Sequence, residues 1–286
     1  VSTCEPRSAA EGRKHAAARA SKAQVAAGRR VVVAARLVVA ALVLAGATLG
    51  AAAPAVDAPV VVREAFLALE SGPVPPPDDA PSWQRVPLLD TWGVERRRVA
   101  TEGWYRTEVT LAAPPTELWA VYLPRVAVNA AVLVNEQLVG DGGRFDEPMA
   151  RNWNRPLFFT VPAGLLRAGA NTVHVRLAML DVAPGLLAPF EIGPERQLRP
   201  VYEHRYLRQI TLAQVATAAT LVTALLLGIV YFRRDPDRNY RWFAAGIACW
   251  AINSADSFIR DVPVPTLAWQ WVTGVAGASL VPCFVF

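Results

Sequence analysis

The sequence has few cysteines: three in 286 residues, at positions 4, 249 and 283. Residues 56–205 contain none, which excludes a disulfide-stabilised module and a thiolate metal site in that stretch. We therefore expect this part of the chain to be stable through its own hydrophobic core, without a metal and without a cofactor.

Catalytic signatures are also missing. The three histidines, His15, His174 and His204, are scattered, and no HExxH, CxxC, GxSxG or Walker sequence occurs. Residues 140–144, GDGGR, have three glycines but lack the strand-to-helix context of a dinucleotide loop, so we interpret them as a turn. We predict no catalytic residue in this chain, and leave open whether a longer parent protein is an enzyme.

Positive charge is concentrated at the beginning of the chain. Residues 1–36 hold eight of the 29 Lys and Arg residues and two of the 24 Asp and Glu residues. The rest has 21 Arg against 22 acidic residues, so no basic domain remains to bind a phosphate backbone. We therefore exclude nucleic acid as a partner.

The first 55 residues combine this basic region with a short apolar run and small residues. That order is typical of a secretory signal, with cleavage after Ala52 or Ala55. An uncleaved signal anchor is the alternative, and in both cases the chain from residue 56 onward is exported. Residues 56–82 contain five prolines between positions 73 and 81, which predicts an irregular, extended linker.

Residues 83–205 have the pattern of a β-sandwich or barrel. Short runs rich in aromatic and β-branched residues alternate with Gly, Pro and Asn, and no long segment of helical period interrupts them. A hairpin with Asn135 and Glu136 at its tip is expected. The runs lie at residues 103–111, 117–124, 130–140, 156–162 and 171–180.

Residues 206–286 are predicted to form membrane-spanning helices at about 209–232, 242–259 and 264–286. The first has 24 residues without charge, which at 1.5 Å per residue is about 36 Å, enough to cross a hydrocarbon core of about 30 Å. The Arg-rich loop at 233–241 is expected inside. Because the third apolar stretch reaches the last residue, we expect the chain to be part of a longer protein.

Two resemblances follow from these residues. Trp104-Tyr105-Arg106, the hairpin from Val132 to Gly140, and the turn Gly169-Ala170-Asn171 resemble the galactose-binding-like jelly roll. That domain stands at the front of glycoside hydrolases of the β-galactosidase type. A jelly roll followed by such spans is similar to bacterial seven-transmembrane receptors with diverse intracellular signalling modules.

The expected fold class is therefore a mainly β extracytoplasmic jelly roll or β-sandwich, followed by an α-helical transmembrane bundle with three of seven helices. The receptor resemblance implies a multi-pass protein of the bacterial inner membrane, with the β domain in the periplasm. The same resemblance implies two partners, the lipid bilayer and a small-molecule ligand, and allows a homodimer. It also implies a cytoplasmic output module of the histidine kinase or diguanylate cyclase type. The alternatives are an accessory domain of a carbohydrate-active enzyme and a membrane-anchored envelope or transport protein.

The candidate ligand is a carbohydrate or a carboxylate, because planar amides, guanidinium groups and an indole offer paired hydrogen bonds and a stacking face. Two alternatives stay open: that the loop around residues 145–156 is tied down by its own side chains, and that Arg106 pairs with a surface carboxylate. Asp256, near the end of the second span, is the candidate intramembrane polar residue with a functional role. The alternative is a purely structural ion pair with Arg260, four residues further on. The candidate ligand-binding residues are Arg106, Arg144, Asp146, Asn152, Trp153, Asn154 and Arg155.

Overall fold

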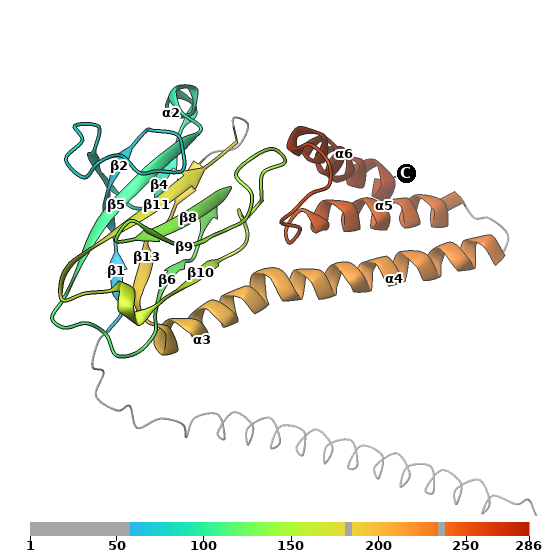
Figure 1. Cartoon of the computed structure of the whole chain (residues 1–286). Helices are drawn as coiled ribbons and strands as arrows, with labels where there is room; N and C mark the ends of the chain where they lie inside the picture. Colours follow the sequence, from blue (N-terminus) through green and yellow to red (C-terminus); the bar gives the residue numbers. More distant parts are fainter. Residues whose placement is uncertain (1–57, 181–184, 234–237, 286) are drawn as a thin grey trace, which may run out of the picture. The chain divides into compact units, whose positions relative to one another are not determined.

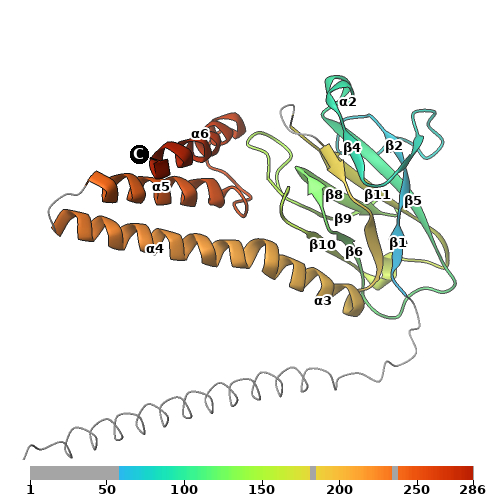
Figure 2. The same cartoon turned by 180° about the vertical axis from the view of Figure 1, so that it is seen from behind.

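The computed structural model describes residues 58–180, 185–233 and 238–285, which belong to one compact unit, Asp57–Phe286. The expected signal segment, residues 1–55, lies outside the described residues. All strand pairs described below are antiparallel. The strands and helices are drawn from two sides in Figures 1 and 2.

Three sheets form the β part of the described chain. The largest has the strand order β3 (Gln84–Pro87), β2 (Glu64–Ala68), β5 (Glu102–Leu111), β11 (Gly169–Ala178), β8 (Asn129–Val134), β9 (Gln137–Asp141). The second has the order β1 (Val60–Val62), β13 (Phe190–Pro194), β6 (Trp119–Leu123), β10 (Leu157–Val161). A small third sheet has the order β4 (Asp90–Trp92), β12 (Gly185–Leu187), β7 (Val126–Ala127).

The two larger sheets share one hydrophobic core, which makes the domain a β-sandwich. Alternate residues of β11, namely Val173, Val175 and Leu177, are at most 1% exposed and enter that core. Side chains on a strand alternate between its two faces, so this pattern is the expected period of two. The predicted hairpin is confirmed: β8 and β9 pair across Asn135 and Glu136, which both have positive φ angles.

Strand β6 is buried on both faces, and the reason is a helix that the sequence pattern did not reveal. Trp119, Val121 and Leu123 enter the sandwich core, while Tyr122 on the other face packs with Leu198. Leu198 belongs to α3 (Glu195–Tyr206), which follows the last strand directly. Helix α3 therefore covers the outer face of β6, whereas Val61 of the edge strand β1 in the same sheet stays exposed.

Two predicted boundaries need correction. The expected linker at 56–82 contains strands β1 and β2, because Val62, Ala65 and Leu67 are apolar enough to be buried there. The irregular, proline-rich part is confined to the chain between β2 and β3. At the other end, the sandwich stops at Pro194 rather than at residue 205, since α3 already begins at Glu195.

Beyond the sandwich the described chain is helical. After α3 come a π-helical turn, η2 (Leu207–Thr211), and the helices α4 (Leu212–Arg233), α5 (Arg238–Ala255) and α6 (Thr266–Val285). Short helical turns within the sandwich are α2 (Val94–Val99) and η1 (Ala163–Leu165). Helix α4 contacts α5, and α5 contacts α6.

One helix among the described residues, Glu195–Ile229, is long and apolar enough to cross a membrane, with a mean hydropathy of 1.9 in its most apolar window. Each of the three predicted spans contains a helix, although α5 ends at Ala255, four residues earlier than expected, and α6 begins at Thr266, two residues later than expected. Asp256 therefore lies in the turn that follows α5 and not within a helix.

Candidate functional site

The loop between β9 and β10, residues 142–156, is held to the sandwich by two buried amides. The Asn152 side chain donates to Asn129 Oδ1 at 2.9 Å and to the Gly142 carbonyl at 2.8 Å. Asn129 in turn donates to the carbonyls of Gly143 and Arg144, each at 3.0 Å. Both asparagines are 0% exposed, so these bonds satisfy groups that would otherwise be buried without a partner.

Glycine is needed where this loop leaves β9. A Cβ atom on Gly142 would lie 2.3 Å from Asn129 Oδ1 and 2.6 Å from Asn152 Nδ2, closer than atoms can approach. Gly143 has φ +112°, a conformation that other residues adopt only under strain. The chain thus bends at Gly142 and Gly143, directly after β9, and Gly142 makes room for the amide pair.

The opposite side of the same loop contacts the helical part of the chain. Arg151 forms an ion pair with Asp256, with Nη1 and Oδ1 2.8 Å apart, and its backbone N–H donates to the Arg260 carbonyl at 3.0 Å. Asp256 Oδ1 also accepts a hydrogen bond from Trp269 Nε1 of α6 at 2.6 Å. Burial lowers the pKa of the Arg151 guanidinium, and the Asp256 carboxylate opposes that shift.

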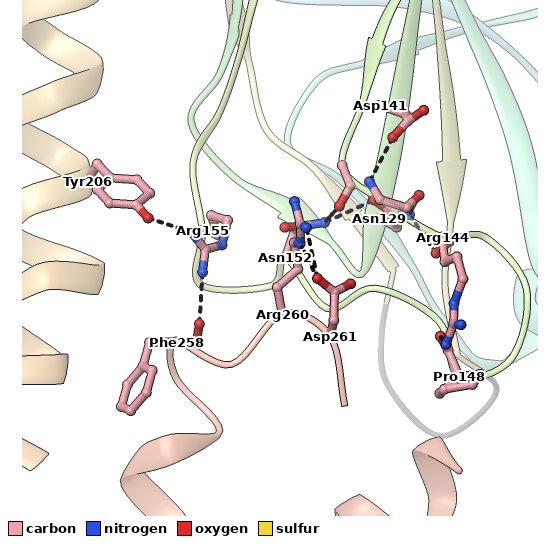
Figure 3. A network of polar contacts seen from close by, with 12 residues as sticks. Asn129, Asp141, Arg144, Pro148, Asn152, Arg155, Tyr206, Phe258, Arg260 and Asp261 are labelled. Atoms are coloured by element: carbon pink, nitrogen blue, oxygen red, sulfur yellow. Dashed lines mark hydrogen bonds and ion pairs between the residues drawn. The ribbon is translucent and has the colours of Figure 1, made fainter. Parts of the chain in front are cut away.

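Asn154 and Arg155 extend this contact. The Asn154 side chain donates to the carbonyls of Gln209 in η2 and of Ser257, at 3.2 and 3.1 Å. Arg155 donates to the Tyr206 hydroxyl at 2.7 Å and to the Phe258 carbonyl at 2.8 Å, so it bridges α3 and the turn after α5 (Figure 3). Its guanidinium carbon also lies 5.4 Å from the centre of the Tyr206 ring, a cation–π contact.

Glu147 completes the contact at the start of α6. Its carboxylate accepts hydrogen bonds from the backbone N–H and the hydroxyl of Thr266, the latter at 3.0 Å. A carboxylate beside the first N–H groups of a helix satisfies an unpaired donor and interacts favourably with the helix dipole. We call the contacts of residues 147–155 with residues 206–209, 256–260 and 266–269 the junction.

The predicted site residues separate into three groups. The side chains of Asn152, Asn154 and Arg155 form hydrogen bonds within the protein. This agrees with the alternative that the loop is held in place by its own side chains. Arg144 and Asp146 are exposed, and Arg144 donates to the Pro148 carbonyl at 3.0 Å within the loop. Trp153 is 38% exposed and contributes to the cavity described below.

Arg106 belongs to a separate cluster on the six-stranded sheet. Its guanidinium pairs with Asp78 at 2.9 Å and with Glu108, the surface pairing that was its alternative. The same Asp78 carboxylate also lies 3.3 Å from the imidazole of His174, which is 2% exposed. Burial lowers the pKa of His174 below its ordinary value, and Asp78 opposes the shift. Trp104, 0% exposed, is a core residue and also contacts His174 edge-on.

Asp256 requires a correction. Its alternative was a pair with Arg260, but Arg260 pairs with the adjacent Asp261, and Asp256 pairs with Arg151. Sequence reasoning missed Arg151, Glu147 and Trp269 as functional candidates. The sequence pointed to Arg151 only indirectly. A carboxylate next to an apolar span, such as Asp256, needs a cation, and the arginine-rich loop at 142–156 could supply one.

A cavity of about 530 Å³ opens beside the junction. One wall is the three-stranded sheet, with Thr91, Val126 and Leu186, and the other contains Trp153 and the Arg151–Asp256 pair. Among the described residues, no group of three or more His, Cys, Asp or Glu side chains could hold a metal ion.

No family model and no curated protein matches this chain. Solved structures that resemble it include a GH2 β-galacturonidase from Eisenbergiella tayi, with 12% identity and a TM-score of 0.35, covering 48% of this chain and 24% of the enzyme. A β-glucuronidase from Faecalibacterium prausnitzii has 19% identity and a TM-score of 0.33, covering 46% of this chain and 22% of the enzyme. An exo-chitosanase from Amycolatopsis orientalis has 11% identity and a TM-score of 0.38, covering 48% and 20%.

The chain thus spans about a quarter or less of the length of these enzymes. The class of the described protein is defined by its own geometry: a β-sandwich joined through a polar junction to apolar helices.

Proposed function

We propose that the chain is the ligand-binding and membrane-spanning part of a bacterial sensor receptor. The sandwich stands on the outer side of the inner membrane, and α4, α5 and α6 cross it. A change in the sandwich is passed through the junction to the helices and from them to an output module of the histidine kinase or diguanylate cyclase type.

The junction is the observation that supports this proposal most strongly. One sandwich loop bonds to η2 just before α4, to the turn after α5, and to the first residue of α6. The start of α4, the end of α5 and the start of α6 therefore lie on the same side, so successive helices run in opposite directions. This is the arrangement that three consecutive membrane spans require, with the sandwich on one side of the bilayer.

The surface of the helices supports a lipid environment. Leu221, Leu225 and Leu226 of α4 are 51%, 65% and 58% exposed, and Trp271 of α6 is 67% exposed. Burying an apolar side chain of this size away from water is worth roughly 1.5–3 kcal/mol, so a helix left in water with this surface would be unfavourable. Hydrocarbon tails would cover it without a protein partner.

The direct link from sandwich to helix supports signal transfer. Helix α3 packs its Leu198 and Tyr202 against β6 and β10, and the chain continues through η2 into α4. A movement of the second sheet would therefore displace α4 along with α3. Single π-helical turns such as η2 are rare, and they frequently lie at functional sites.

Labelling in cells tests the orientation. A variant with the three native cysteines replaced by Ser and with Leu138→Cys, at a position 61% exposed on β9, should react with a membrane-impermeant maleimide in intact cells. A matched variant that keeps only Cys249, in α5, should not react. Labelling of the Leu138→Cys variant only after permeabilisation would refute the proposal.

A further inference from the structure

We propose that the cavity beside the junction binds a small molecule that joins an apolar body to a carboxylate. We further propose that the ligand's carboxylate competes with Asp256 for Arg151. This inference deepens the receptor function proposed above and rests on it for the consequence of binding, although binding itself can be measured independently.

The walls of the cavity select an apolar body. Leu89, Val126, Val128 and Leu186 line it, and Trp153, which is 38% exposed, adds an indole ring. Pockets of 300–1,000 Å³ with mostly apolar walls and a few polar groups are typical small-molecule sites, and this one is about 530 Å³. A planar or branched apolar group would fill this space and stack on Trp153.

The charges in the cavity select an anion. Two guanidinium groups, from Arg125 and Arg151, and one carboxylate, from Asp256, line it. Arg125 is exposed and forms no ion pair or hydrogen bond with its side chain to any described residue, whereas Arg151 is held by Asp256. The described lining therefore has one positive charge in excess, and a guanidinium binds a carboxylate through two parallel hydrogen bonds.

Arg151 couples the cavity to the helices. Its side chain is 8% exposed, and its charged partner among the described residues is Asp256, in the turn between α5 and α6. A second carboxylate beside Arg151 would share that guanidinium and repel Asp256, which still has the Trp269 indole as a donor. Binding would thus favour an arrangement in which the turn after α5 is less firmly held, and a ligand shifts an equilibrium only through such a difference in affinity.

The test uses the full chain in nanodiscs of zwitterionic lipid and titration calorimetry. The probes are indole-3-acetate, 4-phenylbutyrate and octanoate, each paired with its neutral amide of almost the same shape. We expect at least one acid to bind and its amide to bind at least tenfold more weakly, because the amide cannot form a charge-assisted pair.

Three variants locate the site. Arg125→Gln should weaken binding of the acid about tenfold, since it removes the unpaired guanidinium. Asp256→Asn should tighten binding several-fold, because it removes the competing carboxylate. Arg85→Gln, at an exposed arginine of β3 that does not line this cavity, should leave the affinity unchanged.

Three results would overturn the proposal. If none of the acids binds at millimolar concentration, or if acid and amide bind equally, the cavity is not a carboxylate site. If Asp256→Asn weakens binding, the competition for Arg151 is refuted. These outcomes are distinct from failure of the receptor function, which the cysteine labelling of Leu138→Cys decides without any ligand.

Discussion

The two sides of the 142–156 loop contact different parts of the protein and use different kinds of polar group. The inner side uses neutral amides, Asn129 and Asn152, which are 0% exposed and bond within the sandwich. The outer side uses Arg151, Asn154 and Arg155, which reach the helical segments through charged groups and backbone carbonyls. The inner contacts fix the shape of the loop, and the outer contacts are the ones that can be exchanged when a ligand or a helix moves.

The largest expected effect is on the inner side. Asn129→Ala removes the acceptor of Asn152 and the donor to the Gly143 and Arg144 carbonyls, and leaves these buried groups without partners. We expect a loss of about 3 kcal/mol in the free energy of unfolding, because each unsatisfied buried group costs about 1–3 kcal/mol. Denaturant unfolding followed by tryptophan fluorescence measures it, with the exposed Gln137→Ala as a matched control.

A loss below about 1 kcal/mol for Asn129→Ala would contradict the distinction between the two sides. It would mean that the loop keeps its shape without the amide pair.

A smaller effect is expected from the ion pair on the outer side. Arg151→Leu leaves Asp256 without its cation, and we expect a loss of about 2 kcal/mol, less than for a fully buried pair because the Asp256 side chain is 21% exposed. In a double-mutant cycle, adding Asp256→Asn should recover about 1 kcal/mol of that loss. Additive losses would show that the two side chains do not interact.

Asn154→Ala should cost less again, about 1 kcal/mol, because it removes two hydrogen bonds to carbonyls that are part-buried and accessible to replacement donors. The expected loss is confined to the contact between the loop and the helices. Thermal unfolding in nanodiscs measures it, and a larger loss than for Asn129→Ala would reverse the proposed ranking.

A change of pH is expected to act on the sandwich and to leave the contacts of the junction unchanged. His174 faces Asp78 and Arg106, and burial lowers its pKa below the value of about 6.5 found in unfolded chains. The stability that comes from the neutral imidazole is therefore complete above about pH 6.5 and is lost as the pH falls through the lower folded pKa.

We expect the sandwich to lose stability below about pH 6.5 with a slope of at most about 1.4 kcal/mol per pH unit, which is the limit for one proton. His174→Gln should flatten that part of the curve, whereas His204→Gln, in α3, serves as the control. An unchanged slope in His174→Gln would mean that another group titrates there.

The sandwich could be predicted from the sequence to a large extent, for a simple physical reason. Strand residues with one face in the core alternate in polarity, and turns with positive φ, such as Asn135-Glu136, have a limited choice of residues. Alternation fails where both faces are covered, as in β6, because a second layer comes from a distant helix. The helix α3 itself was missed since its pattern is polar, with Pro200 in its interior.

The junction could be predicted only in part. The composition of residues 145–156 indicated a special loop, and planar amides and guanidinium groups suit a ligand as well as backbone carbonyls. Which of these they bind depends on where the turn after α5 lies, and that position depends on tertiary packing. Arg151 illustrates the limit: nothing near it in the sequence distinguishes it from Arg144, yet one is buried and paired and the other exposed.

Hydrogen–deuterium exchange at the turn between α5 and α6 tests the central claim most directly. The chain in nanodiscs is compared with the double variant Asn154→Ala, Arg155→Met and with the control Arg85→Ala, at an exposed arginine of β3. If the loop holds the helices, peptides covering residues 256–266 should exchange faster in the double variant while those of β5 and β11 stay protected, and the control should match the parent chain. Unchanged exchange at 256–266 in the double variant would contradict the claim that the sandwich and the helices are coupled through this loop.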